Sequence, residues 1–183
     1  LVEFADLATI PTLEVLATAF RRPSLGVSDL HTYGEAIVIS EGDVSPSSVD
    51  PKLHSTLRKL LWALYGRPRA RVFSSEGATD LREMFVFLLW SQQWPRLRRS
   101  FRFCTLAFAD RSNKVAPFDL QFAPPNDRAS RSRFGKLLDA DREPVEALPW
   151  LDEALNDLLG SANGELRAFL RESGAELGGG REL

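Results

Sequence analysis

Seven of the eight arginines between residues 67 and 102 form the group of side chains most able to act as a binding site. A guanidinium group holds a carboxylate or a phosphate through parallel hydrogen bonds. We expect three of them, at positions 96, 98 and 99, to project from a short turn and, with Arg67 and Arg69, to bind an anionic partner. The full group is Arg67, Arg69, Arg71, Arg96, Arg98, Arg99 and Arg102.

Aromatic residues lie between these arginines, so the segment 67–102 also has the composition of a nucleic-acid-binding module. Backbone phosphates would contact the arginines, and bases would stack on Trp94, Phe101 and Phe103. The alternation of the aromatics predicts that they are buried, and the chain has a formal net charge of −2. Nucleic acid therefore stays the alternative to a protein partner.

Charge is unevenly distributed along the chain. Residues 1–50 carry 2 basic and 8 acidic side chains, residues 51–102 carry 11 and 3, and residues 137–183 carry 4 and 11. Such a chain either pairs its own segments or presents a basic face to an anionic partner. We favour carboxylates from residues 1–50, from residues 137–183 or from a partner protein.

Residues able to perform catalysis are sparse. Cys104 is the one cysteine, and in an aromatic strand it is typical of a small buried hydrophobe rather than a nucleophile. His31 and His54 lie too far apart to suggest a metal site. No phosphate-binding loop or nucleophile-elbow pattern occurs. We expect no cofactor, no metal and no enzymatic activity, with a cysteine- or carboxylate-dependent enzyme as the third alternative.

Length and composition favour a soluble protein with one main domain. The 183 residues are 44% hydrophobic and 26% charged. With no signal peptide, no apolar run long enough to span a membrane and one cysteine, the chain is expected in the cytoplasm. It begins at Leu1 in mid-pattern, and we expect a fragment of a longer protein or a trimmed chain.

The stretch 79–108 is the expected folding core. Residues Thr79–Trp94 predict a helix that is apolar on nearly every side, so that Trp90 is buried. Pro95 is expected to end this helix, and Phe101–Phe108 alternates as a buried strand containing Phe103. Val115–Phe122 predicts a second strand that forms an antiparallel hairpin with the first.

Other elements flank this core. Asp50 and Pro51 predict the start of a helix over Pro51–Tyr65, and residues 67–75 predict an edge strand. Pro149 starts a predicted helix that ends at Gly160, and a shorter one covers residues 163–173. Nearer the N-terminus, a short helix is expected over residues 12–20 and a buried strand over residues 36–39.

Two segments carry a family resemblance. The sequences WPRLRRSFRFCTLAFADRS and PFDLQFAP, within about residues 30–125, resemble the GTPase-associated protein family. Its members are multidomain bacterial proteins encoded beside a small GTPase in nucleotide-dependent conflict systems of antiviral type. The resemblance implies an adaptor role, with a GTPase or another subunit of the same system as partner, and no catalytic residues.

The sequence thus predicts an α+β fold: a small, mostly antiparallel sheet packed by helices, with a C-terminal helical appendage. The α+β domain covers residues 1–143, and residues 144–183 form the appendage or the start of a second module. The expected function is that of a non-enzymatic interaction or adaptor module of a larger bacterial assembly.

Overall fold

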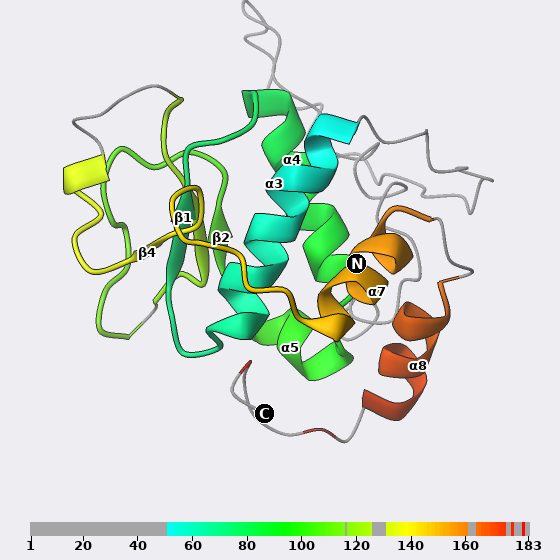
Figure 1. The fold of residues 1–183 in the computed structure, drawn as a ribbon. Helices are drawn as coiled ribbons and strands as arrows, with labels where there is room; N and C mark the ends of the chain where they lie inside the picture. The colour runs from blue at the N-terminus through cyan, green and yellow to red at the C-terminus, as the bar shows by residue number, and fades with distance from the viewer. Residues whose placement is uncertain are drawn as a thin grey trace, which may run out of the picture.

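The fold is that of a computed structural model, which describes residues 51–115, 117–125, 131–160, 164–174, 177 and 181. Helices stand beside a small sheet (Figure 1). The helix predicted over residues 12–20 and the strand predicted over residues 36–39 lie outside the described residues. The elements are α3 (Pro51–Leu61), η2 (Trp62–Gly66), β1 (Val72–Ser74), α4 (Thr79–Ser91), α5 (Pro95–Ser100), β2 (Phe103–Cys104), β3 (Leu120–Phe122), β4 (Leu138–Asp139), α7 (Pro149–Leu158) and α8 (Glu165–Ser173).

The sheet is parallel, so the prediction of a mostly antiparallel sheet in an α+β fold was wrong. Its strand order is β2-β3-β1-β4, and each of its three pairings is parallel. Strand β1 lies between β3 and β4 rather than at an edge, and its three residues are buried. The described fold is therefore of the α/β kind.

The connections between strands explain this difference. Helices α4 and α5 carry the chain from β1 past the position of β3 to β2, so that β2 runs in the same direction as β1. Strands β2 and β3 are much shorter than predicted, so residues 105–119 are free to return the chain to the same edge of the sheet. The hairpin prediction had assigned residues 105–119 to parts of two strands and the short turn between them.

Helix α3 begins at the predicted residue and ends in a wider turn. Its last turn is the π-helix η2, in which the indole of Trp62 packs against the backbone of Gly66. A side-chain carbon at position 66 would lie 3.2 Å from that ring, so glycine allows the close contact. The Arg67 guanidinium covers Trp62, 5.3 Å from the ring centroid.

Helix α4 ends at Ser91, and Pro95 begins a new helix instead of a turn. Trp94 is the extended N-cap residue of α5, and Pro95 occupies the first turn, where proline loses no hydrogen bond. The segment predicted as an exposed arginine turn therefore forms α5. Trp90 is half-buried and Phe103 is 40% exposed, so the prediction that both are nearly fully buried was wrong.

Helix α7 packs into the main core rather than standing apart as an appendage. Leu151, Leu155 and Leu158 belong to the same apolar cluster as Leu57 of α3 and Phe85 of α4. Arg58 of α3 also pairs with Asp152 of α7. The boundary proposed at residue 143 stays a prediction, but α7 shares the core of the residues that precede it.

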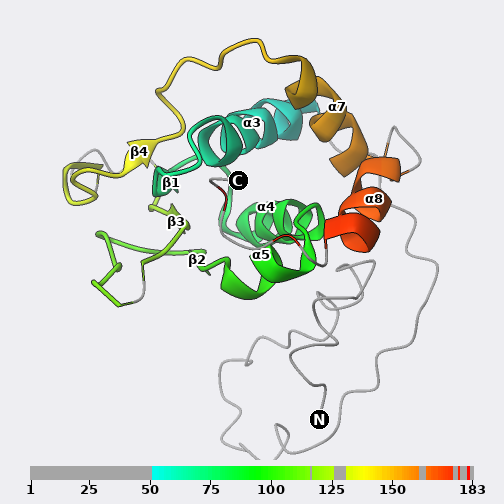
Figure 2. The same ribbon diagram turned by 90° about the horizontal axis from the view of Figure 1, so that it is seen from below.

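The elements lie in layers. Helices α3 and α4 cover one face of the sheet, and α7 lies beyond α3, as both ribbon views show (Figure 2). The other face is covered by loop segments through a second cluster that includes Phe73, Ala123 and Phe134. Phe73 and Phe134 stack with ring centroids 4.6 Å apart.

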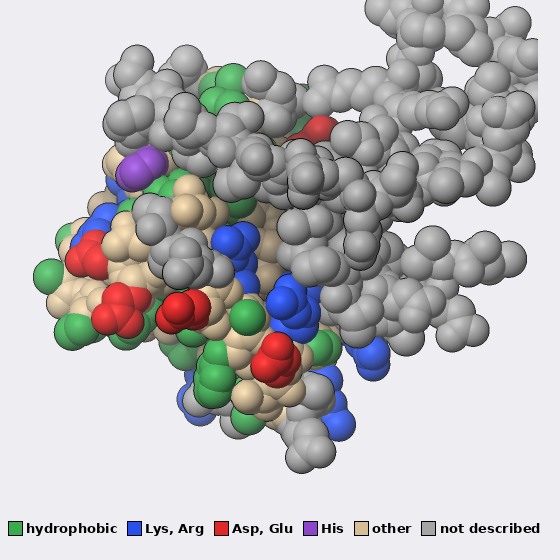
Figure 3. Space-filling model, turned by 90° about the vertical axis from the view of Figure 1, so that its right-hand side faces the viewer, with side chains coloured by type: hydrophobic (Ala, Val, Ile, Leu, Met, Phe, Trp, Pro, Cys, Tyr) green, Lys and Arg blue, Asp and Glu red, His purple; other side chains and the backbone are tan. Residues whose placement is uncertain are grey.

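On the α7–α8 side of the molecule, acidic and basic side chains are interspersed on the surface (Figure 3).

Candidate functional site: an arginine-lined hollow at the amino edge of the sheet

A hollow of about 740 Å³ lies at the amino ends of the strands. Because β1, β2 and β3 are parallel, the residues that precede them meet at one edge: Arg71, Arg102 and Asp119. Helix α5 contributes Leu97 and Ser100. We call this feature the arginine hollow; it is lined by Pro68, Arg69, Arg71, Leu97, Ser100, Arg102, Val115, Pro117, Asp119 and Arg181.

Arg181 enters the hollow from the C-terminal segment. Its guanidinium donates hydrogen bonds to the carbonyl oxygens of Leu64 at 3.0 Å and Ala70 at 2.8 Å, and to Asp119 Oδ1 at 3.0 Å. Its side chain is only 5% exposed. Arg181 therefore satisfies a carbonyl at the end of η2 and holds this turn against the start of β3.

Asp119 is the one carboxylate among the described residues of the lining. Its Oδ2 accepts a hydrogen bond from the backbone N–H of Arg102 at 2.9 Å, while its Oδ1 accepts from Arg181. Both oxygens are thus occupied by donors of the protein itself. Among the described lining residues, an incoming anion would meet guanidinium groups and one partly exposed carboxylate whose oxygens already accept hydrogen bonds.

The described residues of the lining include four arginines and one aspartate. Arg71 is partly balanced by Asp110, with 3.5 Å between the guanidinium and the carboxylate. Burial opposes ionisation of Asp110, but hydrogen bonds from Gln121 and Ser112 and the nearby Arg71 outweigh it and hold its pKa below the ordinary value. Among the described residues, no carboxylate forms an ion pair with the guanidinium of Arg69 or Arg102. These two groups are available to an external anion.

The structure separates the predicted partner-binding arginines. Arg69 lines the hollow, and Arg67 beside it forms an exposed ion pair with Glu146. Arg96 and Arg99 are exposed on α5, next to the lining residues Leu97 and Ser100. Arg98 is 3% exposed and belongs to the protein interior, so it cannot contact a partner.

The sequence analysis missed Arg181 and Asp119. Arg181 follows three glycines near the end of the chain, a composition typical of a linker, and nothing around it indicates a buried position. Asp119 lies in the alternating segment PFDLQF, where its position indicates only a solvent-facing side chain. Only the parallel arrangement of the strands places it beside Arg102.

Apolar side chains are exposed on and after β2, close in sequence to Arg102. Phe103 is 40% exposed, Leu106 42%, Phe108 60%, and Val115, which lines the hollow, 90%. Of these, Val115 lines the hollow and Phe103 directly follows Arg102, so apolar side chains accompany the basic ones there. Such mixed surfaces suit a partner that carries acidic and apolar groups together.

Cys104 is half-buried at the sheet edge formed by β2. Its thiol lies 3.1 Å from the carbonyl oxygen of Leu106, and Arg111 Nη1 lies 3.7 Å from the sulfur. It packs against the second apolar cluster, as expected of a small hydrophobe. The histidine of the described part, His54, is exposed on α3, far from this thiol in sequence.

Comparisons with protein-family models, with curated proteins and with solved structures find no match to this chain. Within the described residues, no helix combines the length and the apolar character needed to cross a membrane.

Proposed function

We propose that this chain is a non-enzymatic interaction module that binds an acidic segment of a partner protein in the arginine hollow. One observation carries the proposal: Arg69, Arg71, Arg102 and Arg181 come from three separate segments and converge on one hollow, and Asp119, the carboxylate among the described lining residues, already accepts hydrogen bonds. Arg96 and Arg99 extend the basic surface along α5. Guanidinium groups held by a rigid sheet edge favour planar carboxylates.

The surroundings of the hollow favour a protein over a polyphosphate. Val115, which lines the hollow, is an exposed aliphatic side chain, which contributes to protein interfaces but offers no ring for base stacking. Residues 137–183 are strongly acidic, and the whole chain has a net charge of −2. A long polyanion would experience this repulsion, whereas a short acidic segment would contact mainly the hollow.

A nucleic-acid-binding function is the second candidate, and one observation favours it. Phe103 and Phe108 are exposed rather than buried, and Phe103 directly follows Arg102. An aromatic ring beside a guanidinium is the pairing that single-stranded nucleic acids use for stacking and phosphate contact. The two candidate functions predict binding of different probes, and a different dependence of the binding affinity on salt concentration.

The resemblance to GTPase-associated adaptors suggests where the partner would come from. We propose a subunit of the same bacterial assembly, such as its small GTPase, acting in the cytoplasm. This extension concerns the identity of the partner and is independent of the chemistry of the hollow.

The test uses the full chain and two fluorescent probes of equal charge: a peptide of alternating glutamate and leucine, and a single-stranded DNA. Anisotropy titrations compare the unaltered chain with Arg69→Gln/Arg102→Gln. The control variant, Arg133→Gln/Lys136→Gln, removes two exposed charges from outside the hollow. We expect the peptide to bind the unaltered and control proteins, and the hollow variant to bind it at least about tenfold more weakly.

Two outcomes would contradict the proposal. One is DNA binding that is tight, falls steeply with salt and is lost in the hollow variant, because this result supports the nucleic-acid candidate. The other is peptide binding that the hollow and control variants weaken equally, because nonspecific attraction to basic side chains anywhere on the surface would then explain it.

A further inference from the structure

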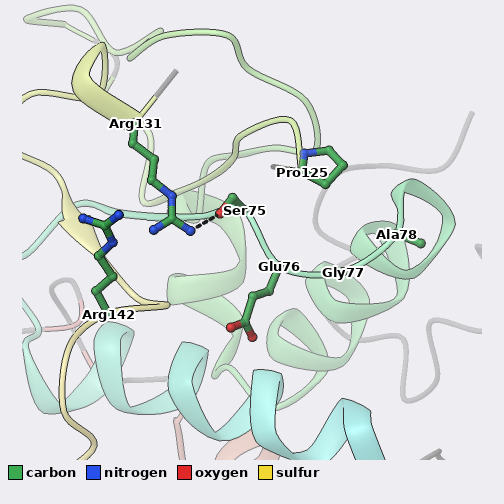
Figure 4. Close-up of a pocket in the computed structure, with 7 residues that line it drawn as sticks. All are labelled: Ser75, Glu76, Gly77, Ala78, Pro125, Arg131 and Arg142. Carbon is green, nitrogen blue, oxygen red and sulfur yellow. Dashed lines mark hydrogen bonds between the residues drawn. The ribbon is translucent and has the colours of Figure 1, made fainter. Parts of the chain in front are cut away.

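A second cavity lies at the opposite end of the strands, outside their carboxyl ends. Its volume is about 810 Å³, within the range of small-ligand sites. In open parallel sheets, ligands commonly bind in the crevice at this edge. The cavity is lined by Ser75, Glu76, Gly77, Ala78, Pro125, Arg131 and Arg142 (Figure 4).

Asp141 is the buried support of this cavity. Its side chain is 5% exposed and accepts hydrogen bonds from Ser74 Oγ at 2.6 Å, Ser75 N at 2.7 Å and Ser75 Oγ at 2.8 Å. It thereby joins the carboxyl end of β1 to the segment that follows β4. These bonds fix the Ser75 hydroxyl at the cavity wall.

Arg131 is held in place by the same network. Its Nη2 donates to Ser75 Oγ at 2.6 Å and lies 3.3 Å from Asp141 Oδ2, and its Nη1 lies 3.4 Å from Asp139 Oδ2. A guanidinium has five N–H donors, so these contacts leave donors for a ligand. Its side chain is 26% exposed, which leaves part of it accessible from the cavity.

Arg142 supplies a second, more accessible guanidinium. Its side chain is 69% exposed, and its Nε lies 3.6 Å from Asp139 Oδ2. In Figure 4 Arg131 and Arg142 lie near each other on one side of the cavity, across from Ala78 and Pro125. The two guanidinium groups are therefore placed to hold one anionic group between them.

The acidic residue of the lining does not occupy this position. The Glu76 carboxylate accepts hydrogen bonds from Lys59 Nζ at 2.7 Å and Thr56 Oγ1 at 3.1 Å, both on α3. It points toward α3 and away from Arg131 (Figure 4). Arg131 and Arg142 are balanced by Asp139 and Asp141, so the site favours one small anion through directed donors rather than a polyanion through excess charge.

The start of α4 adds to this arrangement. Ala78, the N-cap residue, lines the cavity, and no side chain caps the helix. The first backbone N–H groups of a 13-residue helix therefore face this end of the molecule without a capping side chain. This contribution supplements the two guanidinium groups and the Ser75 hydroxyl.

We infer that this cavity binds the phosphate group of a small phosphorylated molecule, with Arg131 and Arg142 as its principal ligand-binding residues. The inference is independent of the proposed function, because the two sites lie at opposite ends of the strands. The volume beyond the arginines accommodates an organic group attached to the phosphate.

The test is calorimetric titration of the full chain at constant ionic strength with three probes: inorganic phosphate, ribose 5-phosphate and ribose. We expect saturable binding of both phosphates, tighter binding of ribose 5-phosphate, and none of ribose. Equal affinity for the two phosphates would overturn the organic-ligand part of the inference. Absence of saturable phosphate binding would overturn all of it.

Substitutions of individual arginines show where on the protein the phosphate binds. Arg142→Gln is the main one, because its exposed side chain can be changed without disturbing the interior, and we expect about tenfold weaker phosphate binding. Arg131→Gln should weaken binding further, and its thermal unfolding is checked first because Asp139 and Asp141 lose a partner. Lys136→Gln is the charge control. If Arg69→Gln/Arg102→Gln abolishes phosphate binding while Arg142→Gln leaves it unchanged, the phosphate binds in the arginine hollow and the inference fails.

Discussion

The Arg98 guanidinium lies 4.9 Å from the ring centroid of Trp90, and Trp90 Nε1 donates a hydrogen bond to the Arg98 carbonyl oxygen at 3.1 Å. Each residue thus contacts the other through a different group, and together they join α4 to α5. The guanidinium also donates to the carbonyl oxygens of Ser91 and Gln93, at the end of α4. A positively charged side chain therefore closes the corner between two helices.

Replacing Arg98 should destabilise the protein, whereas replacing its neighbour should not. Arg98→Gln removes the cation–π contact and leaves buried carbonyls without donors, so we expect the free energy of unfolding to fall by about 2–3 kcal/mol. Arg96→Gln changes an exposed side chain of the same helix and should alter it by less than about 0.5 kcal/mol. Urea denaturation measures both; equal midpoints would contradict the packing role of Arg98.

Gly77→Ala should cost more stability than Gly135→Ala. Both glycines have positive φ, +84° and +57°, so both changes introduce backbone strain of about 1 kcal/mol. At position 77 the new carbon would also lie 2.8 Å from Phe85 Cε2, whereas nothing lies within 4 Å at position 135. We expect an additional cost of about 1–3 kcal/mol at Gly77, measured by thermal unfolding. A larger loss at Gly135 would be inconsistent with this packing.

The stability of the protein should fall in alkaline solution because of Tyr65. Burial raises the pKa of Tyr65 to about 12 from 10.0, with a smaller opposing effect from the Gln93 side chain. A raised pKa in the folded state means that the stabilising contribution is fully present below pH 10.0 and is lost as the pH rises to about 12. The loss is about 2–3 kcal/mol.

Tyr65→Phe is the matched variant for this prediction, because it removes the titrating hydroxyl. Denaturation between about pH 9 and pH 12 should show a steeper decline for the unaltered protein than for the variant. Burial lowers the pKa of Arg98 to about 10, an effect of opposite sign in the same range, but Arg98 is present in both proteins. Parallel pH profiles would contradict the assignment to Tyr65.

Arg181 and Asp119 should be energetically coupled. Arg181→Gln leaves the carbonyl oxygens of Leu64 and Ala70 without their donor, so we expect a loss of about 1–3 kcal/mol. Asp119→Asn should cost less in the Arg181→Gln background than in the unaltered protein, with a coupling energy of about 1 kcal/mol. A double-mutant cycle by urea denaturation gives this value. Strict additivity would mean that their 3.0 Å contact contributes nothing to stability.

The sequence predicted the positions of helices better than the architecture of the sheet. Helix starts at Pro51 and Pro149 and the positive φ of Gly160 agree with local capping and proline signals, and α4 starts at the predicted Thr79. The predicted direction of the strands was wrong, because a strand of two or three residues contains no local information about the direction of the strand that pairs with it. That information lies in the connections, and the helix at Pro95 was mistaken for a turn.

The candidate site was predictable only in part. The enrichment in arginine was visible, and Arg69 and Arg102 do line the arginine hollow. The burial of Arg98 was not visible, because an arginine between arginines indicates an exposed segment, and its partner Trp90 lies in the preceding helix. Arg181 was missed because its contacts depend on residues more than a hundred positions away.

The parallel sheet also determines the order in which the described part can assemble. With every strand pairing spanning a crossover, no hairpin is available as a local starting point, and loop closure must precede each pairing. Helices α3 and α4, with their neighbouring leucines and phenylalanines, are the segments able to form early. Because the arginine hollow and the cavity at the carboxyl ends are built on the two ends of the same strands, neither is complete until the strands align.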